Sequence, residues 1–171
     1  MASNYGLGPD YDIALGSAPT DLQTAVTGLR VSMSNVKSVD VVIIMGAGTA
    51  KDDPTFTLRH HTAATSGTSA DLATITEYYV RSETTLDNDE LWAKVAQAAA
   101  ATIADPGGAG TSAESQQLVV FNVLPSDLPD TSNYISVNVA DVGTNAQLGA
   151  VLYIIHKNAK GDPTSFPLPL R

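Results

Sequence analysis

The stretch VDVVIIM, residues 39–45, is the strongest structural signal in the chain. It is rich in apolar β-branched residues and ends at Gly-Ala-Gly, residues 46–48, which favours a turn. Runs of this kind are typical of a central strand that is buried on both faces. We therefore expect a buried strand here. The run is far shorter than the roughly 20 apolar residues that a membrane-spanning helix needs.

Further strand patterns lie on both sides of this run. Residues 29–33 and 55–60 alternate apolar and polar side chains, the period of a half-buried strand. Residues 74–81, 118–123, 134–139 and 148–156 complete the set, and the last is apolar on both faces, which places it inside a sheet. Short strands joined by Gly, Pro, Ser and Asp turns predict a mainly β fold, a single β-sandwich or jelly-roll-like domain.

The two ends of the chain read differently from this middle. Residues 1–22 contain three glycines and two prolines and show no strand or helix period, so we expect an extended N-terminal arm. Residues 158–171 end in SFPLPLR, whose alternating prolines favour an extended C-terminal arm of polyproline II type. The predicted organisation is thus an arm over 1–22, a β-sandwich body over 23–157 and an arm over 158–171.

Composition and charge exclude several function classes. The 171 residues carry a formal net charge of −9, which disfavours direct binding to nucleic acid or to anionic membranes. The chain has no cysteine, so disulfides, thiolate zinc sites and cysteine nucleophiles are excluded. Residues 1–11 have neither a basic region nor an apolar stretch, so we expect a soluble protein without a secretion signal.

Three motifs suggest cofactor or metal chemistry, and each has a simpler interpretation. MGAGTA, residues 45–50, follows a strand as a dinucleotide-binding loop would, but Lys51 stands where the third glycine belongs and two carboxylates follow. His60 and His61 would point to opposite faces of a strand and so could not share one metal ion. Residues 87–90 (DNDE) are too compact for a helix-loop-helix calcium site, although a weak calcium site shared with a neighbouring loop remains an alternative.

Covalent catalysis finds no support in the sequence. There is no G-x-S-x-G motif, and no serine pairs with a histidine at a recognisable spacing. Asp127 and Asp130 lie in the turn-rich stretch LPSDLPD and are interpreted as turn residues. We therefore expect a protein that is not an enzyme and that uses no cofactor or metal.

Six segments follow one another in a distinctive order. They are VSMSNVKSVDVVIIMGAG (31–48), DPTFTLRHHTAA (53–64), ITEYYVR (75–81), LWAKVAQ (91–97), QLVVFNVLPSDLPDTSNYISVNVADVG (117–143) and AQLGAVLYIIHKN (146–158). This order, with a D-x-T-x-T-L strand and a closing GAVLYII strand, resembles the decoration (cement) and auxiliary head proteins of tailed phages. The resemblance covers about residues 29–157, and its motifs are structural.

The resemblance has direct implications for function. It implies a virion protein on the capsid exterior, made in the host cytoplasm, whose partners are the major capsid protein and copies of itself. It implies no catalytic residues. It also favours a strand over residues 91–97, within a segment (88–101) whose alanines would equally suit a helix.

The apolar anchors of the two arms are the predicted contacts with the capsid or with other subunits. They are Tyr5, Leu7, Tyr11 and Ile13 at one end, and Phe166, Leu168 and Leu170 at the other. An alternative function is that of a tail-tube, connector or receptor-binding component of the virion. A receptor-binding module would bind glycan through an exposed aromatic side chain such as Trp92 or Tyr134.

Overall fold

The computed structural model describes residues 6–7, 10–50, 52, 54–104, 114–140 and 145–158. Over these residues the fold is mainly β, as the sequence predicts. The elements are β1 (Tyr11–Asp21), β2 (Val31–Ser32), β3 (Val36–Met45), β4 (Thr55–His61), β5 (Ser69–Asp71), β6 (Ile75–Glu83), β7 (Ala93–Ala100), β8 (Thr102–Ala104), β9 (Gln116–Val123), the short 3-10 helix η2 (Pro125–Asp127), β10 (Tyr134–Val139) and β11 (Leu148–Lys157).

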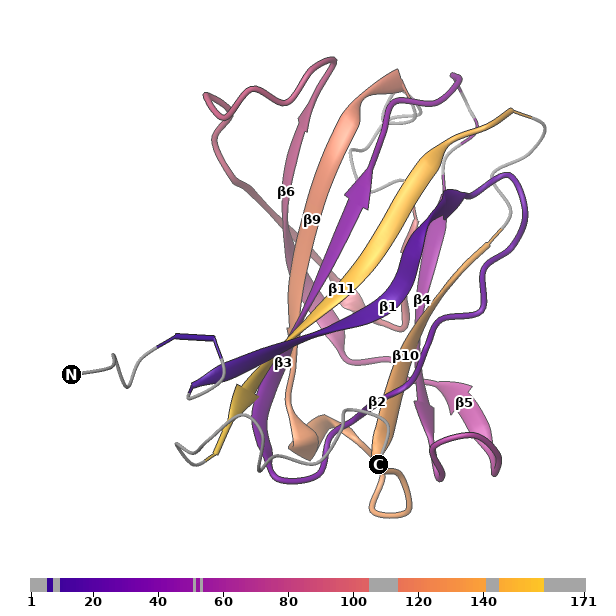
Figure 1. The fold of residues 1–171 in the computed structure, drawn as a ribbon, viewed down its shortest axis with the longest axis vertical. Coiled ribbons are helices and arrows are strands. Elements are labelled where there is room, and N and C mark those ends of the chain that lie inside the picture. Colours follow the sequence, from indigo (N-terminus) through magenta and orange to yellow (C-terminus); the bar gives the residue numbers. More distant parts are fainter. Residues whose placement is uncertain are drawn as a thin grey trace.

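The strands form two antiparallel sheets that pack as a sandwich (Figure 1). One sheet has the order β1-β11-β3-β9-β6-β7, and the other has the order β2-β10-β4-β5 with β8 also paired to β4. Four pairs nest within one another along the chain: β1 with β11, β2 with β10, β3 with β9 and β4 with β8. A long antiparallel ribbon wound around a core in this way is a jelly roll.

The segment between β4 and β8 is an insertion in this ribbon. Strand β5 pairs with β4, whereas β6 and β7 form a hairpin that extends the six-stranded sheet beyond β9. The chain returns to the second sheet at Ala101, whose carbonyl accepts a hydrogen bond from the amide of Leu58. The hairpin therefore widens one face of the sandwich only.

The core lies between the sheets and follows the period-2 alternation of the strands. Val39, Val41 and Ile43 of β3 face Ile135 and Val137 of the other sheet in a cluster from which water is almost fully excluded. The Tyr153 hydroxyl joins the sheets, because it accepts a hydrogen bond from the Val137 amide and donates one to the Leu29 carbonyl. One buried side chain thus connects β11, β10 and the segment before β2.

The prediction of an N-terminal arm over residues 1–22 is wrong from Tyr11 onward. Residues 11–21 form β1, an edge strand that pairs with β11 from Tyr11–His156 to Asp21–Leu148. Two register irregularities around Ser17 accommodate a sequence that lacks a regular period. Pro19 fits because an edge strand tolerates a residue without an amide hydrogen. The body therefore begins at residue 11 instead of 23, and the predicted C-terminal arm lies outside the described residues, apart from Asn158.

Two further predictions are corrected and one is confirmed. Residues 39–45 are a strand, but only the inward-facing side chains are buried, and Ile44 on the other face is 42% exposed. The strand expected over 29–33 is reduced to Val31–Ser32. The strand favoured over 91–97 is confirmed as β7, Ala93–Ala100, whose alanines pair with β6 instead of forming a helix.

Candidate functional site

The outer face of the six-stranded sheet is unusually apolar. Cross-strand register places Leu15, Leu152, Val42, Val120 and Tyr79 in one row across five strands. Neighbouring rows add more apolar side chains. The set that we call the apolar face is Ile13, Leu15, Val42, Ile44, Tyr79, Leu118, Val120, Leu148, Leu152 and Ile154.

Among the described residues, half of the side chains of the apolar face are exposed to solvent. Ile13, Leu15, Ile44, Tyr79 and Leu148 are between 41% and 66% exposed, and the other members are half-buried by their neighbours. An antiparallel sheet with one face in water normally alternates apolar and polar side chains. Here the outward side of β11 is almost wholly apolar, and β3 and β9 each add two apolar side chains among polar ones.

The size of the apolar face can be worked out from strand geometry. Each outward position covers roughly 32 Å², because strands lie about 4.8 Å apart and outward positions about 6.7 Å apart along a strand, so the ten side chains give a patch of roughly 320 Å². The largest apolar patch on a typical monomer is about 300–600 Å², and larger patches mark interaction sites. The apolar face thus lies within the range of the largest patch on a monomer, which is often functional.

Several charged side chains on this side of the sheet have a close partner. Asp40 accepts a hydrogen bond from the Asn122 amide nitrogen at 2.6 Å, and its other oxygen lies 2.7 Å from His156 Nε2. Glu77 forms an ion pair with Lys94 at 2.6 Å. The guanidinium of Arg81 lies over the Trp92 ring, 4.6 Å from its centroid. The Glu77–Lys94 pair is balanced, whereas the neutral Asn122 amide does not cancel the charge of Asp40, and Glu83 adds a carboxylate on the same side of β6.

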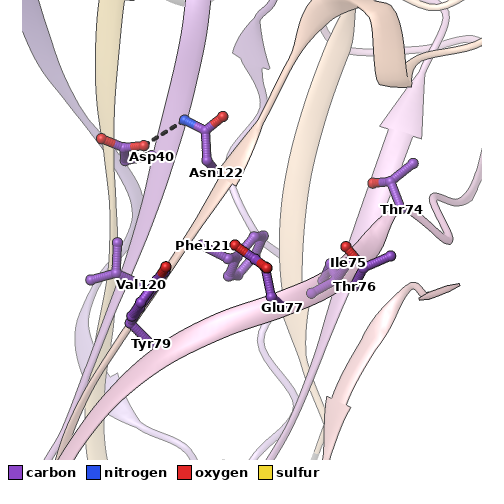
Figure 2. Close-up of a pocket in the computed structure, with 9 residues that line it drawn as sticks. All are labelled: Asp40, Thr74, Ile75, Thr76, Glu77, Tyr79, Val120, Phe121 and Asn122. Atoms are coloured by element: carbon purple, nitrogen blue, oxygen red, sulfur yellow. Dashed lines mark hydrogen bonds between the residues drawn. The ribbon is translucent and has the colours of Figure 1, made fainter. Parts of the chain in front are cut away.

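A cleft of about 360 Å³ opens on the same side of the sheet (Figure 2). It forms where β6 leaves β9, since their pairing extends only from Tyr79–Val120 to Glu83–Gln116. Its lining combines one exposed aromatic ring with carboxylate, amide and hydroxyl groups. The lining residues are Asp40, Thr74, Ile75, Thr76, Glu77, Tyr79, Val120, Phe121 and Asn122. Such a mixture suits a neutral ligand with many hydroxyl groups better than an anion.

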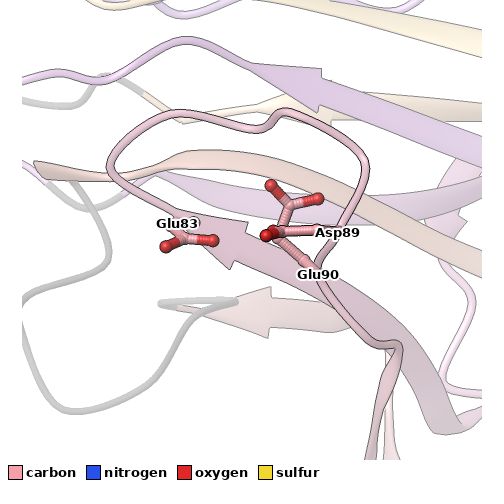
Figure 3. Close-up of side chains that lie close together, drawn as sticks. All are labelled: Glu83, Asp89 and Glu90. Atoms are coloured by element: carbon pink, nitrogen blue, oxygen red, sulfur yellow. The ribbon is translucent and has the colours of Figure 1, made fainter.

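Three carboxylates gather between β6 and the loop before β7 (Figure 3). Glu83, Asp89 and Glu90 bring one oxygen each within 4.8 Å of one another. Glu90 also accepts hydrogen bonds from the Asp87 and Asn88 amides, so it orders the loop in which Asn88 has a positive φ of 80°. The sequence suggested residues 87–90 as oxygen ligands, and the structure adds Glu83 to them. The helix that the alanines of residues 88–101 would equally suit does not form, because Ala93–Ala100 are the strand β7.

His61 is the centre of a polar cluster on the outer side of the other sheet. It is only 5% exposed, although it is the last residue of β4. Its Nδ1 lies 2.6 Å from Ser69 Oγ, and its Nε2 lies 2.8 Å from Ser136 Oγ. Burial lowers the pKa of His61 to about 4, with smaller contributions from Arg30, Arg59 and His60.

The spacing of residues in the sequence did not predict this contact between His61 and two serines. Both ring nitrogens of His61 are used by serines, so no carboxylate can orient the ring as it does in a catalytic triad. Ser136 is also buried, which keeps substrate away from its hydroxyl. The neighbouring His60 bonds to Ser132 through Nδ1 at 2.8 Å. The cluster therefore has the character of a structural network.

The predicted contact residues are only partly placed. Tyr5, Phe166, Leu168 and Leu170 lie outside the described residues. Leu7 is 60% exposed and forms an isolated bridge with Tyr11, and Ile13 belongs to the apolar face. The rest of that face was missed as a site, although the apolar runs in residues 39–45, 118–123 and 148–156 were its signal.

Among the residues that the structure describes, no helix has the length and apolar character to span a membrane. Comparisons with protein-family models, with curated proteins and with solved structures found no match.

Proposed function

We propose that this chain is a non-enzymatic structural protein of a tailed-phage virion that decorates and stabilises the capsid shell. The observation that carries the proposal is the row of exposed apolar side chains across five strands, displayed by an otherwise acidic jelly roll with a complete core of its own. The largest apolar patch on a monomer is often functional, which supports a protein that works in contact with others. The resemblance to phage head proteins and the frequency of jelly rolls among viral capsid domains point the same way, the latter by fold-level analogy.

The proposed mechanism is binding at junctions between major capsid subunits. Apolar side chains in the terminal segments would insert between neighbouring subunits. The 60% exposure of Leu7, beside β1, supports a role as one of these anchors. Many copies on one lattice reinforce one another, because effective concentration makes each additional contact intramolecular. The net charge of −9 keeps the free subunit dispersed before assembly.

Co-sedimentation of the purified protein with expanded, undecorated tailed-phage capsids tests this function. We expect saturable binding at fixed positions that cryo-electron microscopy can locate. A variant without residues 1–9 and 159–171 keeps β1 and β11 whole, because these strands begin at Tyr11 and end at Lys157. Circular dichroism should show that this variant is folded, and it should lose capsid binding. Undiminished binding by the folded variant would refute the assignment of the contact to the arms.

The cleft at β6 and β9 favours a second candidate function, that of a receptor-binding virion component. Tyr79 offers a ring for stacking on a sugar, and Asp40, Asn122 and Glu77 offer hydrogen-bonding groups on rigid strands. A glycan array with the wild type and with Tyr79→Ala separates this candidate from the first. Binding that Tyr79→Ala abolishes, without binding to capsids, would favour receptor recognition. A tail-tube or connector subunit would instead form rings or tubes alone.

A further inference from the structure

A short segment at the edge of the second sheet covers His61, whose side chain points away from the core. Residues 62–71, which we call the covering segment, turn back after β4 and end in β5, the edge strand of that sheet (Figure 1). The Ser69 hydroxyl on this segment lies 2.6 Å from His61 Nδ1, and the Ser136 hydroxyl on β10 lies 2.8 Å from Nε2. The covering segment therefore stands between the imidazole and water.

The covering segment is attached mainly by polar contacts. None of its residues is buried, and the buried side chain that follows it is Leu72. Strand β5 pairs with β4 over three residues only, and Arg30 donates hydrogen bonds to the carbonyls of Ala63 at 2.6 Å and Ser66 at 2.7 Å. Because the segment buries no apolar side chain of its own, its local opening costs far less free energy than unfolding of the sandwich.

Several charged or titratable groups of the described chain surround His61. They are Arg30 before β2, Arg59 and His60 on β4, Asp71 on β5 and Tyr134 on β10. The carboxylate among them, Asp71, is paired with Arg59 at 3.5 Å, and the Arg30 guanidinium lies 3.4 Å from the Ser69 hydroxyl that also contacts His61. A proton on His61 would therefore add a positive charge beside two guanidinium groups, in a place from which water is excluded.

We propose that acid releases the covering segment from β4 while the rest of the sandwich stays folded. His61 accepts its proton once the segment has moved away, because water then solvates the imidazolium and screens it from Arg30. The sandwich stays closed, because its core does not include His61. Release also frees the edge of β4 from Arg59 to His61, which β5 occupies at neutral pH, for pairing with another strand. The device does not depend on the proposed function, so its test needs no partner.

Hydrogen exchange of the full chain, followed by mass spectrometry from pH 8 to pH 4, tests the release. Exchange rates are corrected for the intrinsic effect of pH on amide exchange, so that they report the opening equilibrium. Burial, with smaller contributions from neighbouring charges, lowers the pKa of His61 from 6.5 to about 4 while the segment is closed. The opening constant of residues 62–71 should therefore rise about 30-fold from pH 8 to pH 5, and about 150-fold to pH 4. Residues 39–45 of β3 should stay protected throughout.

Three variants identify the group that responds to acid. His61→Gln keeps a side chain that can hydrogen-bond to both serines but does not titrate, so its opening constant should be nearly independent of pH. His60→Gln is the matched control, because it removes the neighbouring histidine of the same strand, and it should keep the wild-type response. Arg30→Gln removes a cation and the contacts to the Ala63 and Ser66 carbonyls, so it should raise opening at pH 8 and reduce the further rise towards pH 4.

The wild type alone can refute the proposal. A covering segment that keeps its protection down to pH 4 would overturn it, whether or not the variants fold. Loss of protection by residues 39–45 in step with residues 62–71 would also overturn it, because acid would then unfold the whole sandwich. An equal pH response in His61→Gln and the wild type would assign the effect to another group. A segment that opens in acid in the wild type and in His60→Gln, but not in His61→Gln, would support the release.

Discussion

Removal of the Tyr153 hydroxyl should be among the most costly single-atom changes in this protein. Tyr153 is fully buried on β11, and its Oη receives the Val137 amide hydrogen at 3.0 Å. That amide belongs to β10. The neighbouring strand β2 pairs with β10 only through Val31 and Ser32, so it does not reach Val137. The hydroxyl therefore accepts the hydrogen bond that a carbonyl of a neighbouring strand would otherwise accept. It also donates a hydrogen bond to the Leu29 carbonyl at 3.2 Å.

Tyr153→Phe keeps the ring and its packing but leaves the Val137 amide without a partner. An unsatisfied buried donor costs about 1–3 kcal/mol, and loss of the second hydrogen bond adds about 0.5–1.5 kcal/mol. We expect the free energy of unfolding to fall by about 2–4 kcal/mol. For a domain of this size that corresponds to a decrease in Tm of roughly 5–10 °C.

Urea unfolding followed by circular dichroism measures this difference. Tyr79→Phe is the control, because it removes the same atom from a side chain that is 41% exposed. Its effect should stay within about 0.5 kcal/mol, as is usual for surface changes. If Tyr153→Phe and Tyr79→Phe lowered the free energy of unfolding equally, the hydrogen bonds of the buried Tyr153 hydroxyl would not contribute the expected stability.

Two further predictions concern pH and backbone packing. The pKa of His61 is lowered to about 4 in the folded state. As pH falls below about 6.5, only the unfolded chain gains a proton at this histidine. The free energy of unfolding of the wild type should therefore decline from about pH 6.5 towards pH 4. His61→Gln should flatten this decline in urea unfolding measured at several pH values, and an unchanged slope would contradict the assignment. Gly28→Ala should strongly destabilise the protein, because a Cβ there would lie 2.0 Å from the Val137 carbonyl oxygen. Gly46→Ala, whose nearest contact would be 3.5 Å, should be nearly neutral in thermal unfolding, and equal Tm losses would refute the steric account.

The body strands were predictable because their pattern is local. Residues 134–139 alternate so clearly that the predicted and observed strands coincide, and residues 148–156 fall short of β11 by one residue. Period 2 is clear in residues 134–139, which bury one row of side chains, whereas residues 148–156 were recognised as a continuous apolar run inside a sheet. The β class and the sandwich architecture follow from such segments.

The first strand was not predictable in the same way. Gly16 and Pro19 break the period of β1, and its pairing depends on β11, which lies more than a hundred residues away. A Cβ at Gly16 would lie 2.6 Å from a Val151 side-chain atom, so the glycine serves close packing rather than a turn. Residue patterns near the N-terminus cannot report a partner that is so distant in sequence.

The apolar character of residues 39–45 and 148–156 was determined by the sequence alone. Only the tertiary structure decided which side of these strands the chain buries and which side stays exposed. The core forms because the nested pairing of β1–β11 and β3–β9 brings the second sheet over the inner row. The outer row stays in water because, among the described residues, every strand is already used in the sandwich. Hydrophobicity is a property of each residue, whereas exposure depends on what the whole chain places above it.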